Sequence, residues 1–173
     1  MGLGGIGVLI AIVTSGYRMK RFISFINPWK YATDEGYQLV HSLYAIGTGG
    51  LFGVGLGNSK QKALYMPEPH NDFIFAIICE EFGIIFAIGL MIIYFLLFYR
   101  GIRAAFVTKD SYSQLIAVGF STMIACQTLV IIGGIFSVIP LTGITLPIIS
   151  YGGSSVLTIF FALGILQKIS EEA

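Results

Sequence analysis

The 173-residue sequence predicts an all-α polytopic membrane protein. Hydrophobic residues make up 55% of the chain and charged residues only 11%, whereas a soluble domain carries roughly 25% charged residues. The mean hydropathy is +0.85, and several apolar runs approach the length needed to span a bilayer. We expect a single membrane domain over residues 1–173, with about five transmembrane or re-entrant helices and two long outward-facing loops. A net charge of +1 without a basic run excludes nucleic acid as a partner and leaves the lipid bilayer.

The first segments are expected to start in the membrane and then to follow its surface. Residues 2–16 are apolar and reach only roughly 22 Å as a helix, less than the ~30 Å hydrocarbon core, so we expect the chain to start partway along a span. Residues 22–35 mix aromatic and charged side chains around Pro28. Trp29 and Tyr31 favour a position of this segment at the level of the lipid headgroups.

Residues 37–47 predict a short helix that breaks into irregular backbone, because glycine recurs at positions 47, 49, 50, 53, 55 and 57. Residues 73–99 predict a spanning helix that is ended by Arg100 and Arg103. These two segments are joined by a polar loop that contains two prolines.

Residues 113–137 predict a second spanning helix, interrupted by Gly133 and Gly134. Residues 138–153 hold two prolines and three glycines, which indicates a re-entrant or extended loop. A last helix is expected to about Gln167, followed by a short polar tail.

The basic residues predict the orientation of the chain, because lysine and arginine are enriched on the cytoplasmic side of membrane proteins. Five alternating crossings would place eight of the ten basic residues on one side, namely Arg18, Lys20, Arg21, Lys30, Arg100, Arg103, Lys109 and Lys168. Only Lys60 and Lys62 would fall on the other side. The C-terminus is therefore expected in the cytoplasm, and the 57–72 and 138–153 loops are expected to face outward together.

Asp72 is the strongest candidate for a reactive group. It ends the polar loop and directly precedes the apolar run that begins at Phe73. One interpretation is a residue at the start of a helix, stabilised by the helix dipole. The other is a general base at the membrane face, whose pKa is tuned by partial burial and by neighbours such as His70 or Lys62. The two interpretations are compatible.

Glu80 and Glu81 follow about 12 Å further along if the helix is continuous. Ionisable groups inside a membrane must pair or face a polar interior, so these residues cannot form a solvated face. Glu80 would lie about 80° and Glu81 about 180° around the helix from Asp72, so they cannot serve one site together. We expect structural pairing for at least one, while the other could line the cavity on which Asp72 opens.

Other polar and sulfur-containing residues have simpler explanations. His41 is expected to be a satisfied histidine within a polar stripe, and Cys79 and Cys126 are expected to be packing residues. Lys60 and Lys62 either meet an anionic headgroup or diphosphate or are ordinary exposed loop lysines. No metal-ligand spacing is present in the sequence.

Six ordered stretches resemble the SEDS family of cell shape, division and sporulation proteins (FtsW, RodA, SpoVE). They are Phe25 to Trp29, Gly36 to Gln38, Gly49 to Lys62, Pro67 to Phe75, Glu80 to Gly83, and Pro140 to Pro147 with Ser150 to Ser155. The Gly-Asn-Ser-Lys-Gln-Lys stretch is more similar to FtsW and SpoVE than to RodA. The resemblance covers nearly the whole chain, but only the C-terminal half of the family pattern.

The resemblance implies a peptidoglycan glycosyltransferase that polymerises lipid II at the outer face of the bacterial cytoplasmic membrane, together with a class B penicillin-binding protein. It implies that Asp72 takes the proton from the attacking sugar hydroxyl. It also implies substrate binding by Glu68, His70 and Ser150, with the polyprenyl diphosphate leaving group met by Lys60 and Lys62 or by a divalent cation such as Mg²⁺.

Two positions depart from the family pattern. Phe86 stands where glycine is common, and a bulky ring there is expected to shift a neighbouring helix. Asn71 replaces the usual threonine, which is a mild change. Two other functions stay open: a lipid II transporter, and a non-catalytic fragment that acts as an interaction subunit of the division machinery.

Overall fold

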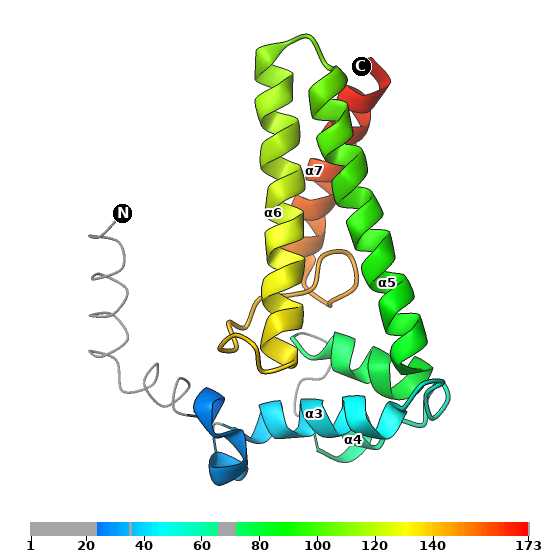
Figure 1. Ribbon diagram of the computed structural model, residues 1–173, viewed down its shortest axis with the longest axis vertical. Helices are drawn as coiled ribbons and strands as arrows, with labels where there is room; N and C mark the ends of the chain where they lie inside the picture. Colours follow the sequence, from blue (N-terminus) through cyan, green and yellow to red (C-terminus); the bar gives the residue numbers. More distant parts are fainter. Residues whose placement is uncertain (1–23, 35, 66–71, 173) are drawn as a thin grey trace, which may run out of the picture.

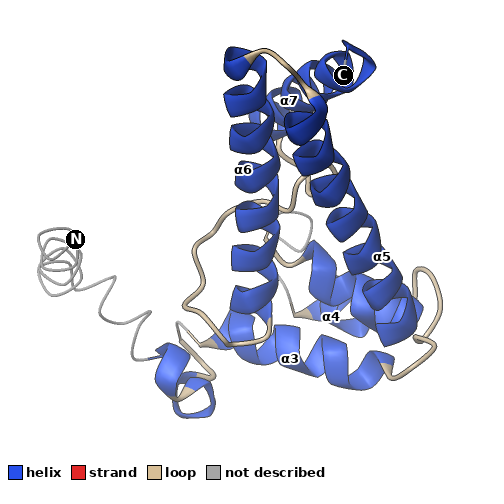
Figure 2. Ribbon diagram, turned by 45° about the horizontal axis from the view of Figure 1, so that its top comes forward, coloured by secondary structure: helices blue, strands red, loops and turns tan. Residues whose placement is uncertain are grey.

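The computed structural model describes residues 24–34, 36–65 and 72–172, and all regular elements in these ranges are helices (Figure 2). They are η1 (Pro28–Tyr31), α3 (Tyr37–Gly49), α4 (Lys60–Leu64), α5 (Ile74–Val107), α6 (Ser111–Ile135) and α7 (Gly153–Glu172). Among them α5, α6 and α7 are long and apolar enough to cross a membrane. The all-α membrane class is therefore confirmed for the described residues, whereas the count of five crossing or re-entrant helices is not.

The three long helices run side by side, and α3 lies across one end of them (Figure 1). We call this the α3 end; it also holds η1, α4, the 50–59 loop and the first turns of α5. The α5–α6 turn and the end of α7 form the opposite end. Separate apolar clusters hold the two ends: one contains Phe75 and Ile135, and the other contains Ala117 and Ile159.

The helix α5 is broken at Gly83, where the backbone adopts φ 83° and ψ 172°. The break frees the carbonyl oxygens of Glu80 and Glu81, which would otherwise accept hydrogen bonds from the residues four positions later. The glycine-rich loop supplies the missing donors: the amide of Val54 bonds to the Glu80 oxygen at 2.9 Å, and that of Gly55 bonds to the Glu81 oxygen at 3.0 Å. The loop therefore satisfies one side of the break.

The same loop satisfies the other side of the break. The amides of Ile84 and Ile85 have lost their helical acceptors, and they bond instead to the carbonyl oxygens of Gly50 at 3.0 Å and Leu51 at 3.3 Å. Two missing helical bonds are thus replaced by four bonds to one loop. Irregular backbone at membrane depth is tolerated where protein covers it in this way.

Only glycine fits where the loop and α5 meet. A Cβ atom at Gly83 would lie 2.3 Å from the Leu51 carbonyl oxygen, and one at Gly53, where φ is 79°, would lie 2.2 Å from the Glu81 carbonyl oxygen. Contacts this short require the backbone to move, and the positive φ values disfavour other residues as well. The predicted short helix followed by irregular backbone is confirmed, and its glycines are explained by this contact.

The expected uninterrupted helix over 73–99 is wrong in two respects. The segment of α5 before Gly83 lies beside α3 across the end of the bundle rather than along the spanning direction (Figure 1). In addition, Arg100 and Arg103 do not end the helix, which continues to Val107. Gly101 lies between the two arginines and packs tightly against Ser121 of α6. The helix continues through this position without a break.

Two further boundaries differ from the sequence-based expectation. Gly133 and Gly134 do not interrupt α6; they form its last turn, where the Gly133 carbonyl accepts hydrogen bonds from the amides of Val138 and Ile139. The expected polar tail after Gln167 continues α7 to Glu172. Residues 136–152 form a loop, close to the predicted 138–153 segment, and this loop folds back from the α3 end toward the middle of the bundle (Figure 1).

The orientation predicted from five crossings requires a correction at Lys30. Because α3 lies across the bundle, Lys30 in η1 is on the same end as Lys60 and Lys62. The other described basic residues belong to the last turns of α5, to the α5–α6 turn and to the last turns of α7, which lie toward the opposite end; they are Arg100, Arg103, Lys109 and Lys168. The described part of the first long loop and the start of the second lie at the α3 end, and the side of the membrane that they face stays a prediction.

The opposite end is closed by an ordinary helix cap. The Asp110 carboxylate accepts hydrogen bonds from the Ser113 hydroxyl at 2.7 Å and from its backbone amide at 2.9 Å. These bonds hold the pKa of Asp110 below its ordinary value. Such a cap starts α6 without any contribution from the α3 end.

Replacement of Gly83 by alanine is expected to destabilise the protein by about 1–3 kcal/mol or more, because its backbone conformation is nearly exclusive to glycine and the new methyl group meets a carbonyl oxygen. Gly89→Ala on the same helix is the matched control, since a Cβ atom there meets nothing within 4 Å. Thermal unfolding in detergent, followed by circular dichroism, measures both. Equal melting temperatures for the two variants would contradict the described break.

Candidate functional site

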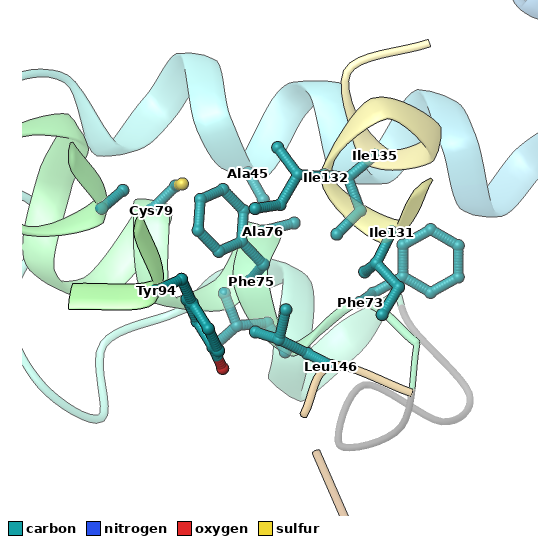
Figure 3. Close-up of a cluster of buried hydrophobic side chains, with 12 residues drawn as sticks. Ala45, Phe73, Phe75, Ala76, Cys79, Tyr94, Ile131, Ile132, Ile135 and Leu146 are labelled. Atoms are coloured by element: carbon teal, nitrogen blue, oxygen red, sulfur yellow. The ribbon is translucent and has the colours of Figure 1, made fainter. Parts of the chain in front are cut away.

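Asp72 is partly buried and lies at the α3 end, directly before the helix α5. Its backbone is anchored by the next residue, because Phe73 is 4% exposed and belongs to the apolar cluster of this end. Figure 3 shows Phe73 beside Ile131 of α6, with Leu146 of the 136–152 loop nearby. The position of Asp72 is thus fixed by side chains from three separate segments.

The interpretation of Asp72 as a residue at the start of a helix agrees with the structure, which places it directly before the N-cap of α5. The N-cap position of α5 is occupied by Phe73, and no side chain at that position bonds to a helix amide. Asp72 therefore stands one residue outside the cap, while the dipole of the helix still favours its negative charge. This placement leaves the general-base interpretation in place.

Lys60 and Lys62 lie in the short helix α4, whose start is held by Ser59 and Glu80. The Ser59 hydroxyl oxygen accepts a hydrogen bond from the Lys62 amide at 3.0 Å, and the hydroxyl donates to Glu80 Oε2. The other oxygen, Oε1, accepts from the Lys60 amide at 3.2 Å. These hydrogen bonds fix the backbone of both lysines. Their side chains are exposed, so the ammonium groups are accessible.

Glu81 is buried beside Glu80 but is less completely paired. Its Oε1 atom lies 3.9 Å from Lys62 Nζ, which is an ion-pair distance too long for a hydrogen bond, and this atom has no hydrogen-bond partner. The prediction that at least one of the two glutamates pairs structurally is confirmed, since Glu80 bonds to the loop. The depth assumed for them along a spanning helix is wrong, because their segment lies across the α3 end.

A second tie connects α4 to α3. Gln61 Oε1 lies 2.7 Å from Nδ1 of His41, and the imidazole stacks on the Tyr65 ring with centroids 4.9 Å apart. The expected satisfied role of His41 is therefore confirmed. The expected packing role is also confirmed for Cys79, which is buried, whereas it stays a prediction for Cys126, which is exposed on α6.

The loop between α6 and α7 is held by polar contacts from the long helices. The Tyr94 hydroxyl donates to the Pro147 carbonyl oxygen, and Gln127 Nε2 donates to the Thr145 carbonyl oxygen at 2.7 Å. Ile148 has a φ of 71°, which is unusual for a β-branched residue and marks local strain. These contacts hold the loop against the bundle despite that strain.

The predicted substrate-binding residues have different environments in the structure. Ser150 is 3% exposed, and its hydroxyl oxygen accepts from the Leu146 amide at 2.8 Å, so it holds a turn of the loop. Its role in substrate binding stays a prediction. Glu68 and His70 lie outside the described residues, as does Asn71.

Phe86 lies on an exposed face of α5 in the described part of the chain. It is 49% exposed, and its ring stacks on that of Phe82, with centroids 4.7 Å apart. The expected effect of this ring on a neighbouring helix stays a prediction.

The His, Cys, Asp and Glu side chains of the described residues are the possible ligands for a metal ion. Over the described ranges, no three His, Cys, Asp or Glu side chains come together in an arrangement that could hold a metal ion.

Lys60, Lys62 and Asp72 were recognised as candidate site residues from the sequence, but the Ser59–Glu80 contact was missed. The serine before Lys-Gln-Lys is a helix-start signal, and the buried glutamate requires a partner, so each half of this contact had a signal.

Comparison with known proteins gives one consistent result. A family model described as a cell cycle protein and named for FtsW, RodA and SpoVE matches residues 1–173. The chain is 47% identical over 171 residues to stage V sporulation protein E of Bacillus subtilis strain 168, a match that covers 98% of this chain and 47% of that protein. It is 46% identical over 177 residues to a probable peptidoglycan glycosyltransferase FtsW of Dichelobacter nodosus, covering 97% of this chain and 45% of the relative.

Solved structures show the same similarity in three dimensions. A chain from a structure of a peptidoglycan synthase complex that coordinates polymerization and crosslinking matches with a TM-score of 0.73 and 26% identity, over 99% of this chain and 48% of that one. A mutant of the rod-shape-determining protein RodA of Thermus thermophilus matches with a TM-score of 0.58 and 32% identity, over 76% of this chain and 39% of that one. The chain thus spans about half the length of the relatives it matches.

Tyr94→Phe is expected to release the strained loop, because the Pro147 carbonyl would lose its buried donor at a cost of about 1–3 kcal/mol. Hydrogen exchange of the amides over residues 146–150 measures the effect, and it should be faster than in the wild type. Tyr99→Phe is the control, since Tyr99 is 51% exposed on the same helix. Unchanged exchange in Tyr94→Phe would show that the hydroxyl does not hold the loop.

Proposed function

Because the chain belongs to the family of cell cycle proteins named for FtsW, RodA and SpoVE, we propose that it forms part of a peptidoglycan glycosyltransferase that polymerises lipid II. The observation that carries this proposal is the position of Asp72. Asp72 is partly buried and directly precedes Phe73, a member of the apolar cluster at the end of the bundle that also holds the exposed Lys60 and Lys62. A general base and cations for a charged leaving group are what glycosyl transfer from a lipid diphosphate requires.

In the proposed reaction, Asp72 accepts the proton of a sugar hydroxyl on one lipid-linked disaccharide. The hydroxyl oxygen forms a bond to the anomeric carbon of the second molecule, and the bond from that carbon to the diphosphate oxygen breaks. The polyprenyl diphosphate leaves with the electron pair. The proton is held on Asp72 until it passes to water or to the leaving group, so the step is balanced.

Negative charge develops on the diphosphate as its bond breaks, and a cation placed there lowers the barrier. We assign this role to Lys60 and Lys62, because their backbone is fixed and their side chains are exposed at the α3 end. A divalent cation such as Mg²⁺ is the alternative, and it would supply the same charge stabilisation. Glu68, His70 and Ser150 are proposed to contact the substrate.

The proposed location is the bacterial cytoplasmic membrane, with several crossings and the C-terminus in the cytoplasm. Three apolar helices support insertion into a membrane. Arg100, Arg103, Lys109 and Lys168 belong to segments that lie toward the end opposite α3, which favours that end as the cytoplasmic one. The α3 end, with Asp72, would then face outward, where lipid II is used.

The proposed protein partner is a class B penicillin-binding protein. The support is the similarity to a chain of a peptidoglycan synthase complex in which polymerization and crosslinking are coordinated. Because this chain spans about half of that one, the remaining part of the fold is expected to complete the substrate cavity.

Asp72→Asn is expected to lower glycan-chain formation from lipid II by about 10²–10⁴-fold, the usual contribution of a general base. The assay uses the chain in proteoliposomes, alone and with the part of Bacillus subtilis stage V sporulation protein E that it does not match. Asp110→Asn is the matched control: it changes the same residue type at the opposite end, where asparagine also caps a helix.

Two outcomes would contradict the proposal. Polymerisation that persists in Asp72→Asn would remove Asp72 as the base. Movement of lipid II across the bilayer without any glycan chains, in a preparation where Asp110→Asn behaves as wild type, would favour the transporter alternative instead.

A further inference from the structure

Glu80 is a buried carboxylate that the reaction proposed above does not use. It is 2% exposed, and apart from Glu81 the helix segment around it is apolar. An ionised group in such a place is retained only when its oxygens are bonded, because desolvation is costly. Both oxygens of Glu80 are bonded, and every bond of its side chain that the structure records goes to the first residues of the lysine-bearing segment.

The bonds of Glu80 act on backbone rather than on the lysine side chains. Oε1 accepts from the Lys60 amide at 3.2 Å, and Oε2 accepts from the Ser59 hydroxyl. That hydroxyl oxygen in turn accepts from the Lys62 amide at 3.0 Å. One carboxylate therefore fixes, directly or through Ser59, the backbone of both lysines.

The Glu80 backbone is itself held in place by the same loop. Its carbonyl oxygen, freed by the break in α5, accepts from the Val54 amide at 2.9 Å. The chain between Val54 and Lys60 is therefore attached to residue 80 at both ends. The lysine segment cannot shift relative to α5 without breaking one of these bonds.

The lysine side chains are held much less firmly than their backbone. Lys60 is exposed, and the 3.9 Å contact from Lys62 Nζ to Glu81 is longer than a hydrogen bond. The Lys62 ammonium group can therefore leave Glu81 for a stronger anionic partner. This combination of fixed backbone and available cation suits the capture of a doubly charged group such as a diphosphate.

We propose that Glu80 is a positioning residue: through Ser59 and the Lys60 amide it sets Lys60 and Lys62 where they bind the diphosphate of a lipid-linked sugar. This inference rests on the proposed function, because the diphosphate is its leaving group. Glu80 does not touch the substrate, and its effect passes through the lysines.

Electrostatics alone makes the opposite prediction, which gives the proposal a sharp test. Removing a negative charge close to the lysines strengthens their attraction for an anion. If Glu80 and Glu81 were merely nearby charges, Glu80→Gln and Glu81→Gln would both bind diphosphate more tightly. If Glu80 positions the lysines, Glu80→Gln binds more weakly, whereas Glu81→Gln binds equally well or more tightly.

The experiment measures how well a ligand protects Lys60 and Lys62 from an amine-acetylating reagent, read by mass spectrometry of the peptide that contains them. The full chain in nanodiscs is titrated with a polyprenyl diphosphate, with inorganic diphosphate, and with phosphatidylglycerol in the nanodisc. We expect half-protection by polyprenyl diphosphate to require about tenfold more ligand in Glu80→Gln, the factor for one lost hydrogen bond to a charged group. Ser59→Ala should behave similarly, and Ser59→Thr, which keeps the hydroxyl, should restore binding.

Each outcome decides the inference. Tighter binding in Glu80→Gln, or equal protection by phosphatidylglycerol and by polyprenyl diphosphate, overturns it. Protection by inorganic diphosphate at higher concentration supports recognition of the diphosphate itself. If Glu80→Gln does not fold, as judged by circular dichroism, then Ser59→Ala and Ser59→Thr decide. Protected lysines in a wild type that forms no glycan chains would refute the glycosyltransferase but not the positioning role, whereas unprotected lysines refute the positioning role directly.

Discussion

The insertion of the glycine-rich loop into the break of α5 is the interaction on which the α3 end depends. A helix that breaks inside a membrane protein exposes amides and carbonyls that lipid cannot satisfy. Here the loop presents two donors and two acceptors in the register of the missing helical bonds. Gly53 and Gly83 allow the two backbones to approach to this distance. The glycines therefore permit the close approach of the two backbones, and the close approach permits the hydrogen bonds that satisfy the break.

The break also determines where the chemical groups lie. It turns the first segment of α5 across the bundle, so that this segment has Asp72 just before its start and Glu80 near its end (Figure 1). Phe73 anchors the start in the apolar cluster, while Glu80 anchors the lysine segment at the other end. A single rigid segment thus relates the proposed base to the proposed cations. Without the break, the same residues would be distributed along a spanning helix.

Much of this architecture follows from the sequence, and the failures have definable causes. Hydrophobic run lengths predicted the α6 helix and the loop after it, because a long apolar run bounded by proline and glycine has few alternatives. They did not predict the break, because Gly83 is a lone glycine within an apolar run, and a lone glycine is often tolerated in a helix. The missing information was tertiary: a loop had to be present to satisfy the broken backbone. The placement of Lys30 failed for the same reason, since α3 was assumed to cross.

Single residues of the candidate site were predicted from the sequence, but the contact between Ser59 and Glu80 was not. Asp72 and the lysines stood out because polar groups are rare in this chain, whereas Ser59 and Glu80 were recognisable only as separate signals. Their contact joins positions that are 21 residues apart, and no local pattern encodes it. Asp72 was expected at the start of a helix, and the structure places it directly before the N-cap residue of α5.

The two ends of the bundle differ in how closely they follow the local structural preferences of their residues. This difference is an argument for function that does not depend on similarity to known proteins. At the opposite end, Asp110 caps a helix and Lys168 pairs with Glu172 one turn away at 2.9 Å, as local preferences dictate. At the α3 end and in the loop that folds back from it, a helix is broken, Ile148 is strained, and Glu81 Oε1 is buried without a hydrogen-bond partner. Such departures are costly and concentrate where a protein binds or reacts. Apart from Ser121 Oγ, which is buried without a hydrogen-bond partner within α6, the departures named here occur in the part of the chain that holds Asp72 and the exposed lysines.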